Sequence, residues 1–209
     1  MGPSSLPITQ QFSALLVAGG QSTRMGRDKA AVKYHGEPLW RHQIATLEAV
    51  GPAEILISGK QDGPYVGASY PVIRDETPGL GPLSGLASGL QHSRNPLVLV
   101  LAIDLPAMEP DFLRALVRQA IDSGKGAVPF DGLRFHPLAA AYPQACLPLA
   151  LAGLRSEDRS LQRFVRASAE SGLIAPREIF PEELGCFENI NTQADLKRLE
   201  AANPAPCAG

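Results

Sequence analysis

The chain has 209 residues, of which 44% are hydrophobic and 19% are charged, enough to bury the core of one domain. Its formal net charge is -2 and its sequence pI is about 6.1, so it lacks the strong basic excess that nucleic-acid binding needs. The longest apolar run, residues 97–103, is far shorter than the roughly 20 residues of a membrane-spanning helix. We therefore expect neither a nucleic-acid partner nor a membrane.

The two ends of the chain and its cysteines predict the domain boundaries and the compartment. Residues 1–11 and 201–209 are rich in proline and small residues, so both segments are predicted to be flexible, with one domain over 12–200. The N-terminal segment lacks the charged and apolar regions of a signal peptide. The three cysteines form no C-x-x-C pair, which argues against a disulfide framework. The expected location is the cytoplasm.

Short apolar runs alternate with helical patterns along the chain. In chain order, they predict a strand at 12–18, a helix at about 38–50, strands at 54–58 and 71–74, a helix from 81–85 to about His92, a strand at 97–103, and helices after Pro110 and after Thr192. Further helical patterns at 147–154 and 161–165 have blurred boundaries. The alternation predicts an α/β fold with a mainly parallel sheet flanked by helices, and the continuous run 97–103 predicts a central strand.

A glycine-rich segment, GGQSTRMGRDK at residues 19–29, follows the first predicted strand. Backbone N–H groups in such a turn can converge on an anion. Arg24 can place two donors on phosphate oxygens, and Lys29 supplies a compact charge where negative charge develops at the reacting phosphorus. The segment matches neither the P-loop nor the dinucleotide-binding spacing. On composition alone, a solvated loop is about as good an interpretation as a triphosphate site.

Acidic residues follow two of the predicted strands. Asp104 comes directly after the run 97–103, and ligands of open α/β sheets gather outside such strand ends. Because Mg²⁺ typically takes one or two protein carboxylates, Asp104 is a candidate metal ligand; a turn or helix-capping aspartate is the alternative. Asp75 follows the strand predicted at 71–74. The segment 81–85 opens a helix whose free amides can meet a phosphate or a base edge, although a plain tight turn is also possible.

The ordered run Ala18-Gly19-Gly20-x-Ser22-x-Arg24-Met25-Gly26-x-Asp28-Lys29 resembles the signature of the molybdenum cofactor guanylyltransferase (MobA) family of nucleotidyltransferases. Further segments resemble the remaining landmarks of that family and occur in the family's order: Asp75, GPLSG at 81–85, Asp104-Leu105-Pro106, His136-Pro137 and Asn189-Ile190-Asn191-Thr192. The resemblance runs from about Phe12 to Leu199, and it implies a Rossmann-like nucleotidyltransferase fold.

The resemblance also implies a reaction and a set of site residues. The reaction is the Mg²⁺-dependent transfer of GMP from GTP to molybdenum-bound molybdopterin, which gives the guanine dinucleotide cofactor and pyrophosphate. Arg24, Lys29 and Asp104 would carry it, with Asp104 holding the metal. The implied nucleotide-binding residues are Val17, Ala18, Gly19, Gly20, Lys29, Ser58, Asp75, Gly81, Gly85 and Asp104. His136, Asn189 and Asn191 are candidates for the pterin side, because imidazole and amide groups can pair with pterin edges.

The chain departs from the family pattern at three positions. Val17 stands where leucine is usual, Thr23 where a second basic residue is frequent, and Ser58 where asparagine is frequent. The departures leave open a related enzyme, a molybdopterin cytidylyltransferase or a sugar-phosphate nucleotidyltransferase, and also a module that binds GTP or the cofactor without turnover. Asp28, where sugar enzymes commonly have proline, disfavours a sugar substrate, and Arg24, Lys29 and Asp104 together disfavour a binding module. Proteins that deliver molybdopterin or mature molybdoenzymes stay open as partners.

Overall fold

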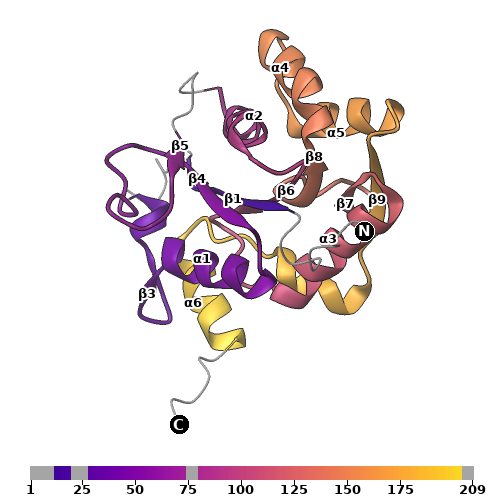
Figure 1. The fold of residues 1–209 in the computed structure, drawn as a ribbon. Helices are drawn as coiled ribbons and strands as arrows, with labels where there is room; N and C mark the ends of the chain where they lie inside the picture. The colour runs from indigo at the N-terminus through magenta and orange to yellow at the C-terminus, as the bar shows by residue number, and fades with distance from the viewer. Residues whose placement is uncertain (1–11, 20–27, 74–79, 204–209) are drawn as a thin grey trace, which may run out of the picture.

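Strands and helices alternate along the chain, as the apolar pattern predicts. The computed structural model describes residues 12–19, 28–73 and 80–203 (Figure 1). The strands are β1 (Ser13–Val17), β2 (Lys33–Tyr34), β3 (Glu37–Pro38), β4 (Glu54–Ser58), β5 (Val72–Ile73), β6 (Leu97–Ala102), β7 (Gly126–Phe130), β8 (Ala139–Pro143) and β9 (Ile174–Glu178). The helices are η2 (Lys29–Ala31), α1 (Leu39–Val50), α2 (Pro82–His92), α3 (Pro110–Ser123), η3 (Gln144–Cys146), α4 (Leu147–Arg155), α5 (Leu161–Glu170), η4 (Pro181–Phe187) and α6 (Gln193–Ala202).

Seven strands form one sheet in the order β5-β4-β1-β6-β8-β7-β9. Neighbouring strands are parallel from β5 to β6, and β7 and β9 are parallel to each other. Among the seven strands described for this sheet, β8 alone runs antiparallel to its neighbours, β6 and β7, while β2 and β3 form a separate antiparallel pair. The predicted α/β class with a mainly parallel sheet is therefore confirmed.

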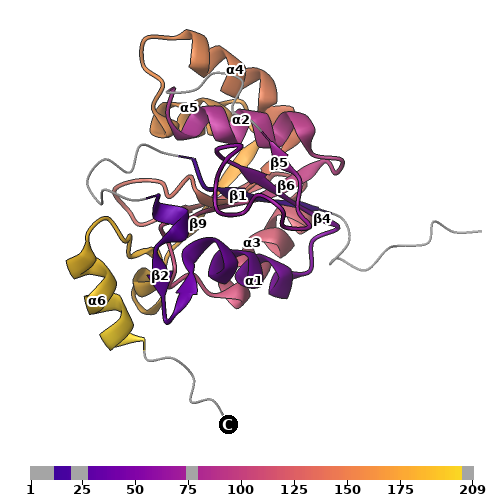
Figure 2. The ribbon, with the colours of Figure 1, turned by 90° about the vertical axis from the view of Figure 1, so that its left-hand side faces the viewer.

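Helices cover both faces of the sheet, which explains the continuous apolar runs of the central strands. Leu16 of β1 and Leu101 of β6 belong to the core shared with α1, α3 and α6, whereas Leu15 and Val100 belong to the core shared with α2, α4 and α5. The two helix layers lie on opposite sides of the sheet (Figure 1, Figure 2). Since successive strand residues point to opposite faces, a strand with two covered faces needs apolar residues at every position.

The ends of two helices show how local sequence sets the boundaries. α1 ends at Gly51, whose φ of 83° is the left-handed conformation that glycine adopts without a Cβ clash. α6 begins after Thr192, as predicted, and the Thr192 side chain accepts a hydrogen bond from Asp195 N in a capping box. α6 extends to Ala202, two residues beyond the predicted domain end at 200, because alanine propagates a helix that Leu196 and Leu199 anchor in the core.

Three strands of the sheet were not predicted: β7, β8 and β9. β8 has the sequence AAAYP, β7 has GAVPF and β9 has IAPRE, and all three lack a run of β-branched residues. Ala139, Ala140, Ala141 and Tyr142 are nevertheless fully buried, since β8 lies between β6 and β7 under helices on both faces. Tertiary packing, and not strand propensity, determines this half of the sheet.

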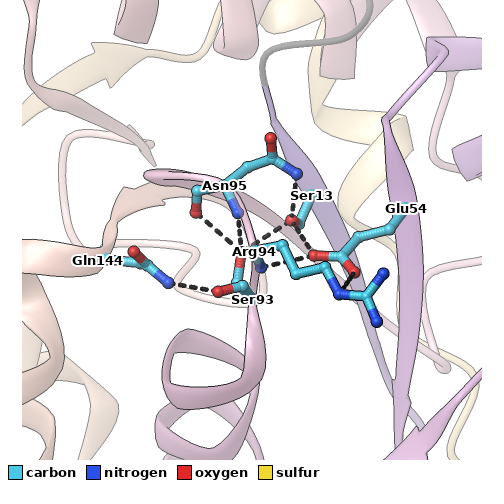
Figure 3. Close-up of polar contacts among 6 residues, drawn as sticks. All are labelled: Ser13, Glu54, Ser93, Arg94, Asn95 and Gln144. Atoms are coloured by element: carbon cyan, nitrogen blue, oxygen red, sulfur yellow. Dashed lines mark hydrogen bonds and ion pairs between the residues drawn. The ribbon is translucent and has the colours of Figure 1, made fainter.

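A polar network joins the strand ends opposite to those that carry the predicted site (Figure 3). Ser13 Oγ donates to Glu54 Oε1 at 2.7 Å and accepts from Asn95 Nδ2 at 3.0 Å, while Arg94 N donates to the same Glu54 oxygen at 2.7 Å. Gln144 Nε2 donates to the carbonyl oxygens of Leu90 and Ser93 at 3.2 and 2.6 Å. These polar groups satisfy one another's hydrogen-bonding capacity. The network therefore has a structural role and links β1, β4 and the α2–β6 connection.

Gly126, at the start of β7, lies in a closely packed part of the second half of the sheet. A Cβ atom added there would lie 2.6 Å from Ala141 O and 2.8 Å from Ile174 Cγ2. We expect Gly126→Ala to lower the free energy of unfolding by about 1–3 kcal/mol, since a backbone carbonyl cannot move aside cheaply. Gly185→Ala is the matched control, because a Cβ at that position meets nothing within 4 Å. Urea unfolding of both variants measures the difference, and equal losses would contradict the prediction.

Candidate functional site

The carboxyl ends of β1, β4 and β6 meet at one edge of the sheet. Ala18 N and Gly19 N both donate to Ser58 O, at 2.8 and 3.1 Å, and Ile103 N donates to Val17 O at 3.0 Å. These hydrogen bonds bring the beginning of the glycine-rich segment next to the ends of β4 and β6. This is the edge at which open parallel sheets bind their ligands.

Lys29 reaches this edge from the short helix η2. Asp28 Oδ1 accepts a hydrogen bond from Ala30 N at 3.0 Å and so caps η2. Lys29 Nζ lies 3.3 Å from Asp104 Oδ2 and 3.0 Å from Asn191 Oδ1. The side chains of Lys29 and Asp104 are only 15% and 24% exposed, so the ion pair is partly screened from water. Residues from three distant parts of the chain thus form one group, the Lys29–Asp104–Asn191 cluster.

Asn191 is held in this cluster by the N-terminal cap of α6. Its backbone N–H donates to Asp195 Oδ2 at 3.0 Å, and this hydrogen bond lowers the pKa of the Asp195 carboxyl. The preceding residue, Ile190, donates its N–H to Asp104 O at 3.0 Å. Asn191 was a candidate for the pterin side, and its amide oxygen contacts Lys29. Asn189 of the same segment is exposed.

His136 lies in the connection between β7 and β8, and among the described residues no hydrogen bond joins it to the cluster. Its Nε2 is 2.8 Å from Asp131 Oδ2, and its ring centroid is 4.4 Å from that of Phe187. The Asp131 carboxylate also accepts hydrogen bonds from the backbone N–H groups of Arg134 and Leu133. These contacts, that of Arg134 first, lower the pKa of Asp131 far below its ordinary range.

The lowered pKa of Asp131 predicts how acid affects this connection. Since the folded-state pKa lies below the ordinary value of about 3.9, the ionised carboxylate stabilises the fold above that pH, and the contribution is lost as pH falls. We expect Asp131→Asn to cost about 1 kcal/mol of unfolding free energy at pH 7 and less at pH 2, because the contribution is lost only as pH falls from about 3.9 toward the folded-state pKa. Urea unfolding at both pH values tests this, with Asp62→Asn on an exposed loop as control. A cost that does not change with pH would contradict it.

The remaining predicted site residues fall into two groups. Val17 ends β1, Gly81 precedes α2 with a φ of 80°, and Gly85 is buried in the first turns of α2. Gly20, Arg24 and Asp75 lie outside the described residues. Their assignments remain predictions from the sequence.

The oxygen atoms of the cluster match what Mg²⁺ requires of a protein. Asp104 supplies a carboxylate and Asn191 an amide oxygen, and both lie within 3.3 Å of the same Lys29 ammonium. Within the described part of the chain, no group of three His, Cys, Asp or Glu residues could enclose a metal. One carboxylate with waters and substrate phosphates is a usual Mg²⁺ environment, so the residues fit a metal that enters with a nucleotide.

Sequence reasoning missed two side chains of α1 that contact the turn around Asp104. Gln43 Nε2 donates to Ala102 O at 2.8 Å and to Leu105 O at 2.9 Å, and His42 Nε2 is 2.8 Å from Pro106 O. A signal was present for Gln43, because it lies on the same helix face as Trp40, Ile44 and Leu47, where a polar residue is unexpected.

Comparison with known proteins shows the family to which this chain belongs. Residues 14–172 match the family model described as "MobA-like NTP transferase domain". The chain belongs to this family. Two relatives of this MobA-like chain are "Probable molybdenum cofactor guanylyltransferase" of Opitutus terrae, 38% identical over 90% of this chain and 94% of the relative, and "Molybdenum cofactor guanylyltransferase" of Pseudomonas putida, 30% identical over 82% and 89%. The family resemblance deduced from the motifs is therefore confirmed.

A solved structure agrees with the MobA-like fold. The molybdopterin-guanine dinucleotide biosynthesis protein A of Archaeoglobus fulgidus superposes with a TM-score of 0.75 at 22% identity, covering 91% of this chain and 97% of that one. This likeness concerns the fold. Nucleotidyltransferases generally use a divalent metal. The carboxylate of Asp104 and the amide oxygen of Asn191 are suitable ligands for such a metal. None of the described helices has the length and apolar character needed to cross a bilayer.

Proposed function

We propose that this protein transfers GMP from GTP to molybdenum-bound molybdopterin, forming the guanine dinucleotide cofactor and releasing pyrophosphate. The observation that carries the proposal is the Lys29–Asp104–Asn191 cluster at the carboxyl edge of the parallel strands. The names of the two relatives support the same reaction. In that reaction, a phosphate oxygen of molybdopterin attacks the α-phosphorus of GTP. A new P–O bond forms, and the bond to the bridging oxygen breaks so that its electrons leave with pyrophosphate.

The cluster would stabilise charge without a covalent intermediate on the protein. In-line transfer at phosphorus requires positioning and neutralisation of the phosphoryl oxygens more than a protein nucleophile. We assign Lys29 to the triphosphate, where its ammonium would exchange part of its contact with Asp104 for phosphate oxygens. Backbone amides from Gly19 onward, together with Arg24, would hold the remaining phosphates.

Asp104 would hold the metal, and Mg²⁺ is the ion we propose. When bound, Mg²⁺ would supply charge neutralisation at the phosphate oxygens and orient them for attack. Asp104 is suited to this role because its backbone is fixed by Ile190 N at 3.0 Å and its carboxylate by Lys29 at 3.3 Å. Val17, Ala18, Ser58, Asp75, Gly81 and Gly85 are assigned to the nucleotide, and His136 and Asn189 to the acceptor.

The decisive experiment is transfer of label from α-labelled nucleotide to molybdenum-loaded molybdopterin by the purified protein in the presence of Mg²⁺. GTP, CTP, ATP and UTP are compared at equal concentrations. We expect label from GTP alone. Label from CTP would replace the proposal with a cytidylyltransferase, and nucleotide binding without any transfer would replace it with a binding module.

We further propose that the protein works in the cytoplasm. Cys146 and Cys186 are buried and form no disulfide, as is usual for cysteines in a reducing compartment. Burial also raises the pKa of the Cys146 thiol to about 11, which keeps it protonated and unreactive. Proteins that supply molybdopterin or receive the product are candidate partners. Fractionation of cells tests the location, and co-purification of molybdopterin-carrying proteins with the tagged protein tests the partners. Absence of the protein from the cytosolic fraction would contradict the first statement, and absence of such proteins would contradict the second.

A further inference from the structure

Asp104 lies in a turn in which most backbone carbonyl groups accept hydrogen bonds from other parts of the chain. We define the Asp104 turn as residues 102–106, directly after β6. Ile190 N donates to Asp104 O at 3.0 Å, and His42 Nε2 is 2.8 Å from Pro106 O. Since a carbonyl oxygen only accepts, His42 Nε2 must carry the proton. The turn is thus held by the segment that precedes α6 on one side and by α1 on the other.

Gln43 makes two further hydrogen bonds to this turn. Its single amide nitrogen donates to Ala102 O at 2.8 Å and to Leu105 O at 2.9 Å, so both of its hydrogens are used. The two carbonyls flank Ile103 and Asp104, and the bridge therefore restrains the backbone dihedrals of these two residues. Gln43 is 0% exposed, so water cannot replace the amide.

Burial of the Gln43 side chain also costs free energy, because one of its polar atoms has no hydrogen bond within the described part of the chain. Among the described residues, its Oε1 is buried and accepts no hydrogen bond. An apolar side chain at this position would avoid that unsatisfied oxygen, as Ile44 and Leu47 do on the same face of α1. The two hydrogen bonds that the amide nitrogen donates are the interactions that offset this cost.

We infer that Gln43 is a positioning residue that sets the direction of the Asp104 carboxylate for the metal–nucleotide complex, with His42 as a weaker second support. The inference rests on the proposed function. Mg²⁺ demands nearly ideal octahedral geometry, so a small rotation of its carboxylate ligand weakens binding. Groups that orient a metal ligand from behind typically change metal affinity by about 10–100-fold when they are removed.

The chain offers a matched control for this inference. Gln144 Nε2 also bridges two backbone carbonyls, those of Leu90 and Ser93, but at the opposite edge of the sheet. Figure 3 shows its contact with Ser93. Gln43→Met and Gln144→Met each remove a glutamine amide from two carbonyl groups. Only Gln43→Met releases the Asp104 turn.

The test measures Mn²⁺ binding in the presence of GTP by electron paramagnetic resonance, with no acceptor added, together with the melting temperature of each variant. We expect Gln43→Met to weaken Mn²⁺ binding by about ten-fold or more, and Gln144→Met to bind Mn²⁺ as the unaltered protein does. Wild-type affinity in Gln43→Met, or equal losses in both variants, would overturn the inference. A lower melting temperature without any change in Mn²⁺ affinity would show a merely structural role and would overturn it as well.

A second variant covers the case in which Gln43→Met does not fold. His42 is only partly buried, and His42→Leu releases Pro106 O from the same turn. It should weaken Mn²⁺ binding in the same direction by a few-fold, and an unchanged affinity would overturn the inference. If the unaltered protein bound no Mn²⁺ with GTP, the proposed function would fail, and the inference would fail with it. If the unaltered protein and both variants bound Mn²⁺ equally well, the inference alone would be overturned.

Discussion

Replacing Lys29 with methionine is expected to lower kcat by about 10²–10³-fold, equivalent to about 2.7–4 kcal/mol of transition-state stabilisation. The ammonium is the positive centre of the Lys29–Asp104–Asn191 cluster, within 3.3 Å of both partners. Methionine retains the length of the side chain but cannot neutralise the charge that develops on the phosphoryl oxygens. Label transfer from α-labelled GTP under single-turnover conditions measures this chemical step without product release.

Lys33→Met is the control for the loss of one positive charge near η2, because Lys33 is exposed on β2. It should leave kcat within about two-fold of the wild-type value, since surface charges far from the reacting atoms are screened by solvent. A Lys29→Met enzyme with wild-type turnover would remove Lys29 from the mechanism.

Asp104→Asn is expected to lower kcat by about 10²-fold or more and to abolish metal binding that depends on the nucleotide. The substitution keeps the shape of the side chain but removes the negative charge, and an amide oxygen is a poorer Mg²⁺ ligand than a carboxylate. Stability should change by only about 1 kcal/mol, because the ion pair with Lys29 is partly exposed. Raising the Mg²⁺ concentration should restore little of the activity, since the ligand charge itself is missing.

Mn²⁺ titration by electron paramagnetic resonance in the presence of GTP separates metal binding from turnover. Asp122→Asn is the control, because Asp122 is exposed near the end of α3. The double variant Lys29→Met/Asp104→Asn should be less impaired than the product of the two single effects, since residues in contact are not independent. Strictly multiplicative losses would indicate that the two side chains act separately.

The first half of the fold could be predicted because local pattern and final environment agree there. The run 97–103 is apolar at every position, and residues 97–102 of it form the buried central strand β6. The helix predicted at about 38–50 is α1, which ends before Gly51. β8 could not be predicted in the same way. Its alanines acquire their strand conformation from β6 and β7 on either side, which local sequence does not encode.

The site was predictable where chemistry follows from position along one strand. Asp104 could be selected because it ends a continuous apolar run, and Lys29 because it closes the glycine-rich segment. The contact of Lys29 with Asn191 joins residues 162 positions apart, and no spacing rule predicts such a pair. The same holds for Gln43, whose partners belong to a turn about 60 residues further along the chain.

One departure from the family pattern has a structural explanation. Ser58 stands where asparagine is frequent, yet its backbone oxygen accepts the hydrogen bonds from Ala18 N and Gly19 N. The side chain is fully buried at the end of β4. The attachment of the glycine-rich segment to β4 therefore depends on the backbone, and serine can provide it as well as asparagine.

The order of strands in the sheet constrains how the chain folds and how it is made. β7 precedes β8 in sequence, but β8 lies between β6 and β7, paired with β6 from Leu97↔Pro143 to Leu101↔Ala139. One side of the most apolar strand therefore has no partner until residue 143 has left the ribosome. A nascent or truncated chain that ends near Phe130 presents an open apolar edge, which is the kind of surface that chaperones bind and that drives aggregation. Folding of the central sheet is thus postponed until about two thirds of the chain has been synthesised.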